Sequence, residues 1–481
     1  MDDRLQIRID SGPNAQARAW AVRFLARVAG VAFRIDVLPV TAPGGPGPTL
    51  YYGRGKGLPG VTIEQSEFFD GDLGRFSTPV ERPAAMLGGV PVLFGDGKIV
   101  RAEGATRIGA DLVASAFYLA SCIEERSPGE RDRHGRFQAA ASFLGKNGFL
   151  AVPVADEYAR IISAEIGRLY RGLVRKRPWP GEAPFAVCVT HDIEHLRKPS
   201  RLGYMKARAL AGGRLAARGQ FGEAATQWGA GVRRAIRMPS ALTSIELLRG
   251  AARPWPATFY FFGQATSPLD GAYDVGSSEV TAVIRGLRAE GCEIGVHLGY
   301  ETGADEALME AQRSRVESAS VARVEGERHH YLRAEFPDGW KAHEKAGFAY
   351  DASLAFAEAA GFRAGTCHPF RPFDVEAGRE MEVVEVPLVA MDGTFFQYGH
   401  MDEDETVARV VGLAETVRRA GGVFTLLWHN TMIDPIDTPA QSRAYSRITA
   451  ALREMAGWGA TVSECVRNWR SYSASLEEEH V

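Results

Sequence analysis

The sequence has no long apolar run, few cysteines and almost no excess of charge, and each absence excludes a class of protein. No stretch approaches the roughly 18–20 uninterrupted apolar residues of a membrane-spanning helix. The net charge is only −3 over 481 residues, which gives no reason to expect a nucleic-acid partner. The five cysteines lack the paired spacing of a zinc ribbon, and the first residues lack the basic and then apolar pattern of a secretory signal. We therefore expect a globular protein of the cytoplasm.

Residues 1–150 are predicted to form a smaller α/β domain. The predicted elements are strands over 5–9 and 31–38, a helix over 15–29, a hairpin over 90–100 and a long amphipathic helix over 106–125. The domain shows no cluster of catalytic residue types, because its only histidine, His134, lies in a charged loop. We interpret it as a scaffold or recognition domain.

A helix and linker over residues 151–182 lead into a larger region, 183–475, in which strand-like and helical stretches alternate. The strand-like stretches are 185–195, 257–263, 292–297, 324–331, 350–354, 383–388 and 423–429, and helices over 279–290, 305–318, 405–420 and 442–456 separate several of them. Such an alternation is typical of a (β/α) barrel or an open parallel sheet. We therefore predict an α/β fold for this region.

An insertion at about 197–250 separates the first two strands of this region. Its first part carries ten basic residues against one acid, Glu223, with apolar residues between them. The basic residues are Arg197, Lys198, Arg201, Lys206, Arg208, Arg214, Arg218, Arg233, Arg234 and Arg237. A basic amphipathic segment can lie on an anionic membrane surface, or it can form a solvated helical cap over the barrel mouth.

Polar side chains gather where four of the predicted strands end. In α/β folds, reactive groups sit at the C-terminal ends of parallel strands. The groups are His191, Asp192, Glu194 and His195 at the first strand, His297 and Glu301 at the third, Arg328 to Tyr331 at the fourth, and Trp428, His429 and Asn430 at the last. A single histidine is more often structural, but four clusters at four strand ends indicate an active site.

The spacing of His297 and Glu301 indicates a metal site. Residues four apart share one face if a helical turn begins at the strand end. With a carboxylate from the first strand they would form a His/carboxylate site with open positions for water, suited to zinc, iron, cobalt or manganese. A carboxylate outside the metal's shell can then take a proton from water, and a histidine across the site can protonate a leaving group.

The order of these motifs resembles the polysaccharide deacetylase family, the NodB-homology carbohydrate esterases, over residues 185–470. The stretch 361–373 resembles a divergent bacterial subgroup with an extra N-terminal domain. The resemblance implies a distorted (β/α) barrel that binds a divalent metal, with zinc as the first expectation, and removes acetyl groups from sugars. The first motif matches residues 190–194 and implies that Asp192 is the general base and Glu194 a metal ligand.

The second and third motifs imply the rest of the metal shell and the groups that orient the base. The second matches His297, with Glu301 where the family has a second histidine, so Glu301 becomes the third ligand. The third resembles residues 328–331, so that Arg328 would orient the base and the backbone N–H of Tyr331 would help to form an oxyanion hole. His330 stands where the family has proline and is an additional candidate for the metal shell.

The fourth motif resembles Asp351-Ala-Ser-Leu354, and the fifth resembles Leu426-Leu-Trp-His429. The fifth motif implies that His429 is the general acid. Two further histidines are candidates for a supporting role, His195 beside the first motif and His368 as a contact for substrate.

We therefore predict a metal-dependent hydrolase that removes an acetyl or related acyl group from an amino sugar in a polysaccharide or its precursor. Two alternatives stay open: hydrolysis of another non-peptide C–N bond, as in a cyclic amide or ureido compound, and a carbohydrate-binding module whose catalytic site has decayed. The basic insertion adds the hypothesis of a peripheral contact with a membrane or a lipid-linked substrate.

Overall fold

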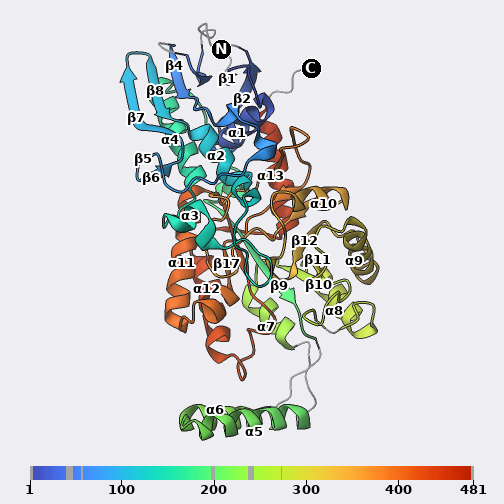
Figure 1. Cartoon of the computed structure of the whole chain (residues 1–481). Helices are drawn as coiled ribbons and strands as arrows, with labels where there is room; N and C mark the ends of the chain where they lie inside the picture. Colours follow the sequence, from blue (N-terminus) through green and yellow to red (C-terminus); the bar gives the residue numbers. More distant parts are fainter. Residues whose placement is uncertain are drawn as a thin grey trace.

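The computed structural model describes residues 4–38, 47–55, 58–196, 201–236, 243–271 and 273–477. These residues form two large sheets, two small two-stranded ones and the helices around them (Figure 1). A six-stranded sheet lies at the end of the molecule that holds both termini, and a nine-stranded sheet forms the middle. The second sheet carries the strand ends singled out above.

The N-terminal sheet has the order β2-β1-β3-β4-β8-β7 and is parallel except for the antiparallel pair β7–β8. Its strands are β1 (Leu5–Ile9), β2 (Phe33–Val37), β3 (Thr49–Gly53), β4 (Gly60–Glu64), β7 (Gly95–Ala102) and β8 (Ala105–Ala110). The helices of this region are α1 (Ala15–Ala29), α2 (Leu112–Ala120), α3 (Phe143–Lys146) and α4 (Val154–Leu169). The predictions of the first two strands and the first helix are confirmed.

Two predictions in the N-terminal region are wrong. Residues 90–100 do not form one hairpin, because β6 (Val90–Val92) pairs with β5 (Ala85–Leu87), and β7 pairs with β8. The first part of the predicted helix 106–125 is instead strand β8, which lies between β4 and β7 in the sheet. The helix that follows, α2, has all nine residues buried and therefore no polar face.

The larger sheet is curled and parallel, with the order β16-β13-β12-β11-β10-β9-β18-β17 and with β19 beside the beginning of β9. Its strands are β9 (Ala186–Ile193), β10 (Thr258–Phe262), β11 (Glu293–Leu298), β12 (Gly326–His329), β13 (Tyr350–Asp351), β16 (Val384–Glu385), β17 (Ala390–Met391), β18 (Val423–Leu427) and β19 (Trp458–Gly459). All eight residues of β9 are buried, as expected for a strand covered on both faces. The predicted α/β class is confirmed, and the sheet is open between β16 and β17 within the described residues.

Helices cover the outside of this sheet. They are α7 (Thr243–Ala252), α8 (Ser278–Ala289), α9 (Glu306–Ser320), α10 (Gly339–Lys345), α11 (Glu403–Ala420), α12 (Pro439–Glu454) and α13 (Val462–Leu476), and a small hairpin joins β14 (Phe373–Asp374) to β15 (Arg379–Glu380). The four helices expected from the sequence are confirmed to within a few residues, whereas α10 and α13 were not predicted.

The insertion is helical, as its composition suggested: it forms α5 (Arg201–Ala217) and α6 (Phe221–Ile236) and also contains most of α7. Helices α5 and α6 pack against each other at the end of the molecule away from the N-terminal sheet (Figure 1). Of the predicted basic set, Arg197, Lys198 and Arg237 lie outside the described residues. None of the described helices combines the length and apolarity needed to cross a bilayer.

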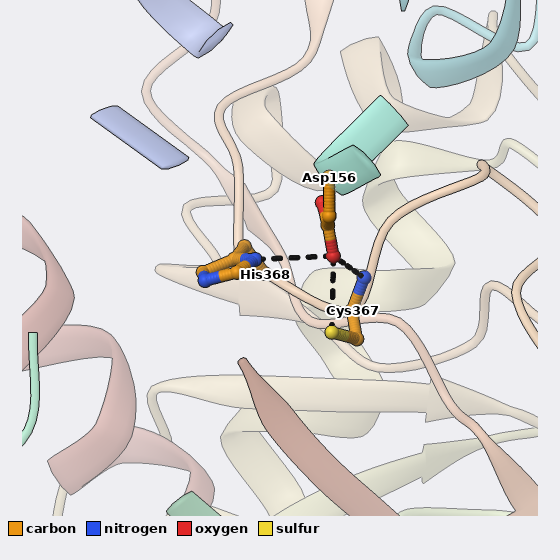
Figure 2. Close-up of side chains that lie close together, drawn as sticks. All are labelled: Asp156, Cys367 and His368. Atoms are coloured by element: carbon orange, nitrogen blue, oxygen red, sulfur yellow. Dashed lines mark hydrogen bonds and ion pairs between the residues drawn. The ribbon is translucent and has the colours of Figure 1, made fainter. Parts of the chain in front are cut away.

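The N-terminal region and the larger sheet share a packed core. Trp20 of α1 packs near Phe373, with ring centroids 5.8 Å apart, and its indole N–H donates to the carbonyl of Arg371 at 2.8 Å. At the start of α4, Asp156 accepts hydrogen bonds from the backbone N–H and the thiol of Cys367 (Figure 2). The N-terminal region is therefore packed directly against the larger sheet.

Candidate active site

A pocket of about 200 Å³ opens at the C-terminal ends of the parallel strands. Its polar lining includes Asp192, Glu194 and His195 after β9, His330 and Tyr331 after β12, and His429 after β18. Side chains alternate between the two faces of a strand. Asp192 therefore enters the pocket, whereas His191 faces the outer layer, where its ring lies 4.8 Å from that of Phe259.

Asp192 is held as a carboxylate by a buried arginine. Nη1 of Arg328 donates to Oδ1 of Asp192 at 3.0 Å and to the hydroxyl of Thr190 at 2.8 Å. Burial disfavours the charged form, but the neighbouring His297 and Arg328 outweigh burial and lower the pKa of the Asp192 carboxyl. Its other oxygen, Oδ2, lies 3.7 Å from Nε2 of His297. The carboxylate is thus charged and held in one orientation, with Oδ2 facing the pocket.

Glu194, His297 and His330 form a group that can hold a metal ion, with one ligand atom of each within 4.8 Å of the others. Nδ1 of His297 lies 2.9 Å from the carbonyl of Arg328, and a carbonyl only accepts, so Nδ1 carries the proton. Nδ1 of His330 lies 2.7 Å from Oδ1 of Asp270. Both rings are therefore oriented through Nδ1 with Nε2 left for the cluster, as is usual for metal-binding histidines.

The atoms that meet in this group are of the kinds that bind a divalent metal. Nε2 of His297 is buried without a hydrogen-bond partner, and Nε2 of His330 lies 3.3 Å from Oε1 of Glu194. Burial lowers the pKa of His297 to about 4, which keeps the ring neutral. A neutral imidazole and a carboxylate are the forms that bind zinc and related ions.

Glu301, predicted as the third ligand, does not join this group. Its side chain is 58% exposed and lies 3.4 Å from Nη1 of Arg333. The prediction required a helical turn directly after β11, but the chain makes a separate turn there and helix α9 begins only at Glu306. His330, named only as an additional candidate, lies beside Glu194 and His297 instead.

His429 faces the metal-binding group from the other side of the pocket. Its Nε2 lies 3.6 Å from Oε1 of Glu194 and 4.0 Å from Oδ2 of Asp192. Its Nδ1 lies 2.6 Å from Oδ1 of Asp392, whose Oδ2 accepts from the backbone N–H of His429. Burial opposes protonation, but the charges of Asp392 and Glu194 outweigh burial and raise the pKa of His429 to about 10. The ring is therefore a proton donor at neutral pH.

Asp392 was missed in the sequence, and the residue matched to the fourth motif lies elsewhere. Asp351 is fully buried on the outer face of the sheet, next to Glu327 of β12, and does not line the pocket. Asp392 follows β17, a strand of two residues at the end of the apolar stretch 386–391. The available signal was an aspartate at the end of an apolar stretch, but the stretch follows directly on the predicted strand 383–388 and was not recognised as a second strand.

The N-terminal region, interpreted as a scaffold without catalytic residues, contributes a wall of the pocket. Arg136 lines it and donates from Nη1 to the carbonyl of Tyr331 at 2.9 Å. The ring of His134 lies 4.6 Å from that of Tyr331. Tyr331 has a φ of 60°, a left-handed conformation that is unfavourable for a residue with a side chain. The contacts from His134 and Arg136 therefore help to hold this backbone turn.

The two remaining histidine candidates occupy different places. His195 is exposed at the edge of the pocket, and its carbonyl accepts from the side-chain amide of Asn430. His368 is buried where the N-terminal region meets the larger sheet, with Nδ1 3.2 Å from Oδ2 of Asp156 (Figure 2). His368 does not line the pocket, because it belongs to a segment that packs against the start of α4.

Comparisons with known proteins give partial matches. A family model described as "Family of unknown function (DUF7033)" matches residues 13–171, about a third of the chain. The curated proteins contain no match. Similar solved structures include proteins described as polysaccharide deacetylases from Mycobacterium smegmatis (16% identity, TM-score 0.39, covering 63% of this chain and 95% of that one) and from Pseudomonas aeruginosa PAO1 (15%, 0.41, 62% and 94%). PuuE allantoinase is also similar (14%, 0.41, 62% and 94%). At these identities and TM-scores, the likenesses do not decide the function.

Proposed function

We propose that the protein is a metal-dependent hydrolase that cleaves the acyl C–N bond of an acylated amino sugar, with acetyl as the expected acyl group. One observation carries the proposal: an oriented carboxylate, a His/carboxylate group that can hold a metal ion and a histidine with a raised pKa meet in one pocket. Amide hydrolysis needs a base for water, stabilisation of the carbonyl oxygen and an acid for the departing amine. The three features match these three needs.

Asp192 is the general base in this proposal. Arg328 holds Oδ1, so that Oδ2 is the oxygen left to take a proton from water in the pocket. His429, kept protonated by Asp392, donates its proton to the leaving nitrogen. A divalent ion held by Glu194, His297 and His330 would acidify the water and polarise the acyl carbonyl.

Tyr331 is proposed to stabilise the carbonyl oxygen through its backbone N–H. The left-handed turn at Tyr331 places a peptide group at the pocket wall, and Arg136 fixes the carbonyl of the same residue. A backbone N–H fixed before the reaction stabilises a developing oxyanion without reorganising during the reaction. Arg136 acts here as a positioning residue.

The size of the pocket bears on what it holds. Its volume of about 200 Å³ is smaller than the roughly 300–1,000 Å³ of pockets that enclose a drug-sized ligand. The pocket therefore suits the acyl group and the atoms next to it, while the sugar would lie at the mouth near the exposed His195 and Tyr398. The same combination of base, metal and acid could also hydrolyse the C–N bond of other small substrates, such as a cyclic amide or a ureido compound.

The test is a substrate panel with the metal-loaded full chain. Acetate release is measured from N-acetylglucosamine oligomers, lipid-linked acetylated amino sugars and acetylated nucleotide sugars, with a cyclic amide and a ureido compound assayed in parallel. We expect acetate from at least one acetylated sugar with wild type and none with Asp192→Asn. Turnover of only the cyclic amide or ureido compound would favour the other C–N hydrolase. A protein that binds no metal and turns over nothing would favour the decayed binding module.

We propose in addition that the hairpin α5–α6 contacts an anionic membrane or lipid-linked substrate. Leu210, Phe221 and Val232 are exposed by 63%, 70% and 59%, and basic residues lie among them. Exposed apolar side chains next to basic ones suit the surface of an anionic bilayer. Co-sedimentation with phosphatidylserine vesicles should exceed that with phosphatidylcholine vesicles and fall in Phe221→Ser. No binding to anionic vesicles at low salt would remove this part of the proposal.

A further inference from the structure

The outer face of β12, β13 and β16 carries a second group of acidic and histidine side chains. In the parallel register Glu327 lies beside Asp351, and Asp351 lies beside Glu385, so three neighbouring strands present three carboxyl groups in a row. His343 of α10 lies over this row, and His329 points to the same face two residues after Glu327. All five side chains are at most 2% exposed. The row is therefore shut off from solvent.

Only some oxygens of these three carboxyl groups accept a hydrogen bond from the protein. Oδ1 of Asp351 accepts from the backbone N–H of Ser353 at 2.7 Å, and Oε2 of Glu385 accepts from the indole N–H of Trp340 at 2.8 Å. Oδ2 of Asp351, Oε1 of Glu385 and both oxygens of Glu327 have no hydrogen-bond partner. Buried polar atoms are rarely left without a partner in folded proteins. Four such oxygens in one place therefore call for a bound cation or for protons shared between neighbouring carboxyl groups.

His343 contributes an unpaired nitrogen to the same place. Its Nε2 lies 3.0 Å from Nε2 of His329, a hydrogen bond that orients the ring. Its Nδ1 is buried without a hydrogen-bond partner and lies 3.4 Å from both Oε1 of Glu327 and Oδ2 of Asp351. These separations are longer than a usual N–H···O hydrogen bond. They fall within the spacing of about 3.3–3.6 Å between two ligands that each lie ~2.0–2.2 Å from one tetrahedral metal ion.

We propose that Glu327, Asp351 and His343, with Glu385 beside them, hold a second divalent metal ion, separate from the ion of the pocket. Their free atoms make a set of one nitrogen and several oxygens, which suits zinc, manganese, iron or cobalt. Because His329 shares a hydrogen bond with Nε2 of His343, it supports the ligand from behind, as partners of metal-binding histidines do.

The charges around the row support a cation. Within the described residues, the ion pairs of Glu327 and Asp351 are with His343 alone. The adjacent Arg328 is turned to the inner face and donates to Asp192 and Thr190. Without a cation, burial and the charge of Asp351 both raise the pKa of the Glu327 and Glu385 carboxyls, which favours protons shared within the row. The negative charge of the row can be neutralised by a metal ion or by shared protons, and an experiment can distinguish the two.

The site would fasten α10 to three strands of the sheet. Its ligands come from β12, β13, α10 and β16, and β12 is followed directly by His330 of the pocket. A metal ion on the outer face would thus stabilise the strand that supplies Arg328 to the inner face. Its expected role is structural, because no pocket is lined by the free atoms of the row among the described cavities.

Metal analysis of the full chain tests the proposal. The samples are wild type, His297→Ala, which disables the pocket site, Glu327→Gln, which disables the outer site, and the double variant. Glu325→Gln is the matched control, because it lies two residues before Glu327 and pairs with Arg467 at the surface. We expect about two metal equivalents per chain in wild type and Glu325→Gln, about one in each single variant and none in the double variant.

Thermal unfolding with and without a chelator supplies a second readout for variants that fold poorly. In His297→Ala, which leaves the outer site intact, the chelator should lower the melting temperature. His297→Ala with no bound metal and no chelator effect would overturn the proposal, whether or not Glu327→Gln folds. The proposed function fails differently: wild type and His297→Ala would then hold the same single equivalent. A Glu327→Gln protein that keeps the metal content of wild type would also overturn the outer site.

Discussion

Strand β12 lies between two groups of acidic and histidine residues, one on each face of the sheet, and the faces differ in what surrounds them. On the inner face, Arg328 binds Asp192 at the edge of an open pocket. On the outer face, Glu327 and His329 lie under α10 with no access to solvent. In the sequence these residues form one run, and the alternation of a strand divides it between two places. Adjacent polar residues therefore need not share a function.

A third group shows that residue types alone do not make a metal site. Asp156, Cys367 and His368 lie together between α4 and the larger sheet (Figure 2). Oδ2 of Asp156 accepts from the backbone N–H and the thiol of Cys367, each at 3.0 Å, and Oδ1 accepts from Thr366. Burial and the charge of Asp156 raise the pKa of the Cys367 thiol, which keeps it protonated. This carboxylate already has its partners, in contrast to the row on the outer face.

Asp192→Asn should have the largest effect on activity, because it removes the proposed general base of the inner face. The amide oxygen of the introduced side chain can still accept from Arg328, so the fold and metal content should stay close to wild type. Loss of a general base lowers the rate by about 10²–10⁴-fold. Measurement of kcat/KM beside metal content and circular dichroism checks this. A fully active variant would exclude Asp192 as the base.

Asp392→Asn should lower activity less than Asp192→Asn and should change the pH dependence of activity. Asp392 helps to raise the pKa of His429 to about 10, so removing its charge lowers that pKa. His429 must be protonated to act as acid, and activity is lost as pH rises through its pKa. The alkaline limb of kcat/KM should therefore move to lower pH, with a fall of roughly 10–100-fold near neutrality. An unchanged alkaline limb would show that Asp392 does not set the pKa of the group that acts as the acid.

Trp340→Phe should affect stability and leave catalysis unchanged, because Trp340 acts only on the outer face. The change removes the donor to Oε2 of Glu385 and leaves a buried oxygen unpaired. The expected loss is about 1–3 kcal/mol in the free energy of unfolding. Denaturant unfolding and kcat/KM are measured on the same preparation. Lost activity in a variant of unchanged stability would mean that the two faces are coupled more closely than their contacts indicate.

Glu301→Gln should have the smallest effect of all. Its side chain is exposed and pairs only loosely with Arg333, so the free energy of unfolding should change by no more than about 0.5 kcal/mol. Metal content and kcat/KM should match wild type. A variant that lost its metal would show that Glu301 moves into the site on metal binding and would restore the ligand set implied by the family resemblance.

Much of the larger sheet could be predicted, because buried parallel strands are continuous apolar runs. The strands β9, β10, β11, β12 and β18 were found in this way. Their ends bring Asp192, Glu194, His297, Arg328 and His429 together, since parallel strands finish at one edge of a sheet. The predicted stretches 350–354 and 383–388 contain the short strands β13 and β16. Strand β17 follows β16 in the same apolar stretch but lies at the other edge of the sheet, so it was not recognised as a separate strand, and Asp392 was missed with it.

The prediction of Glu301 as the third ligand depended on the backbone conformation after β11, which sequence spacing does not determine. His297 and Glu301 share a face only in a helical turn, and the chain after β11 does not form one. His330 reaches the site because the chain turns sharply at Tyr331, which has a positive φ. That turn is held by Arg136, which lies far earlier in the chain, and no local pattern reports such a contact.

Apolar periodicity and strand polarity are local properties, and they were enough to predict the α/β class and several polar residues at the ends of parallel strands. The face that each polar group occupies, the buried atoms without partners and the N-terminal residues that line the pocket could not be predicted from local pattern. These depend on where a strand ends and on what packs against it, and both are set by contacts between residues far apart in the chain.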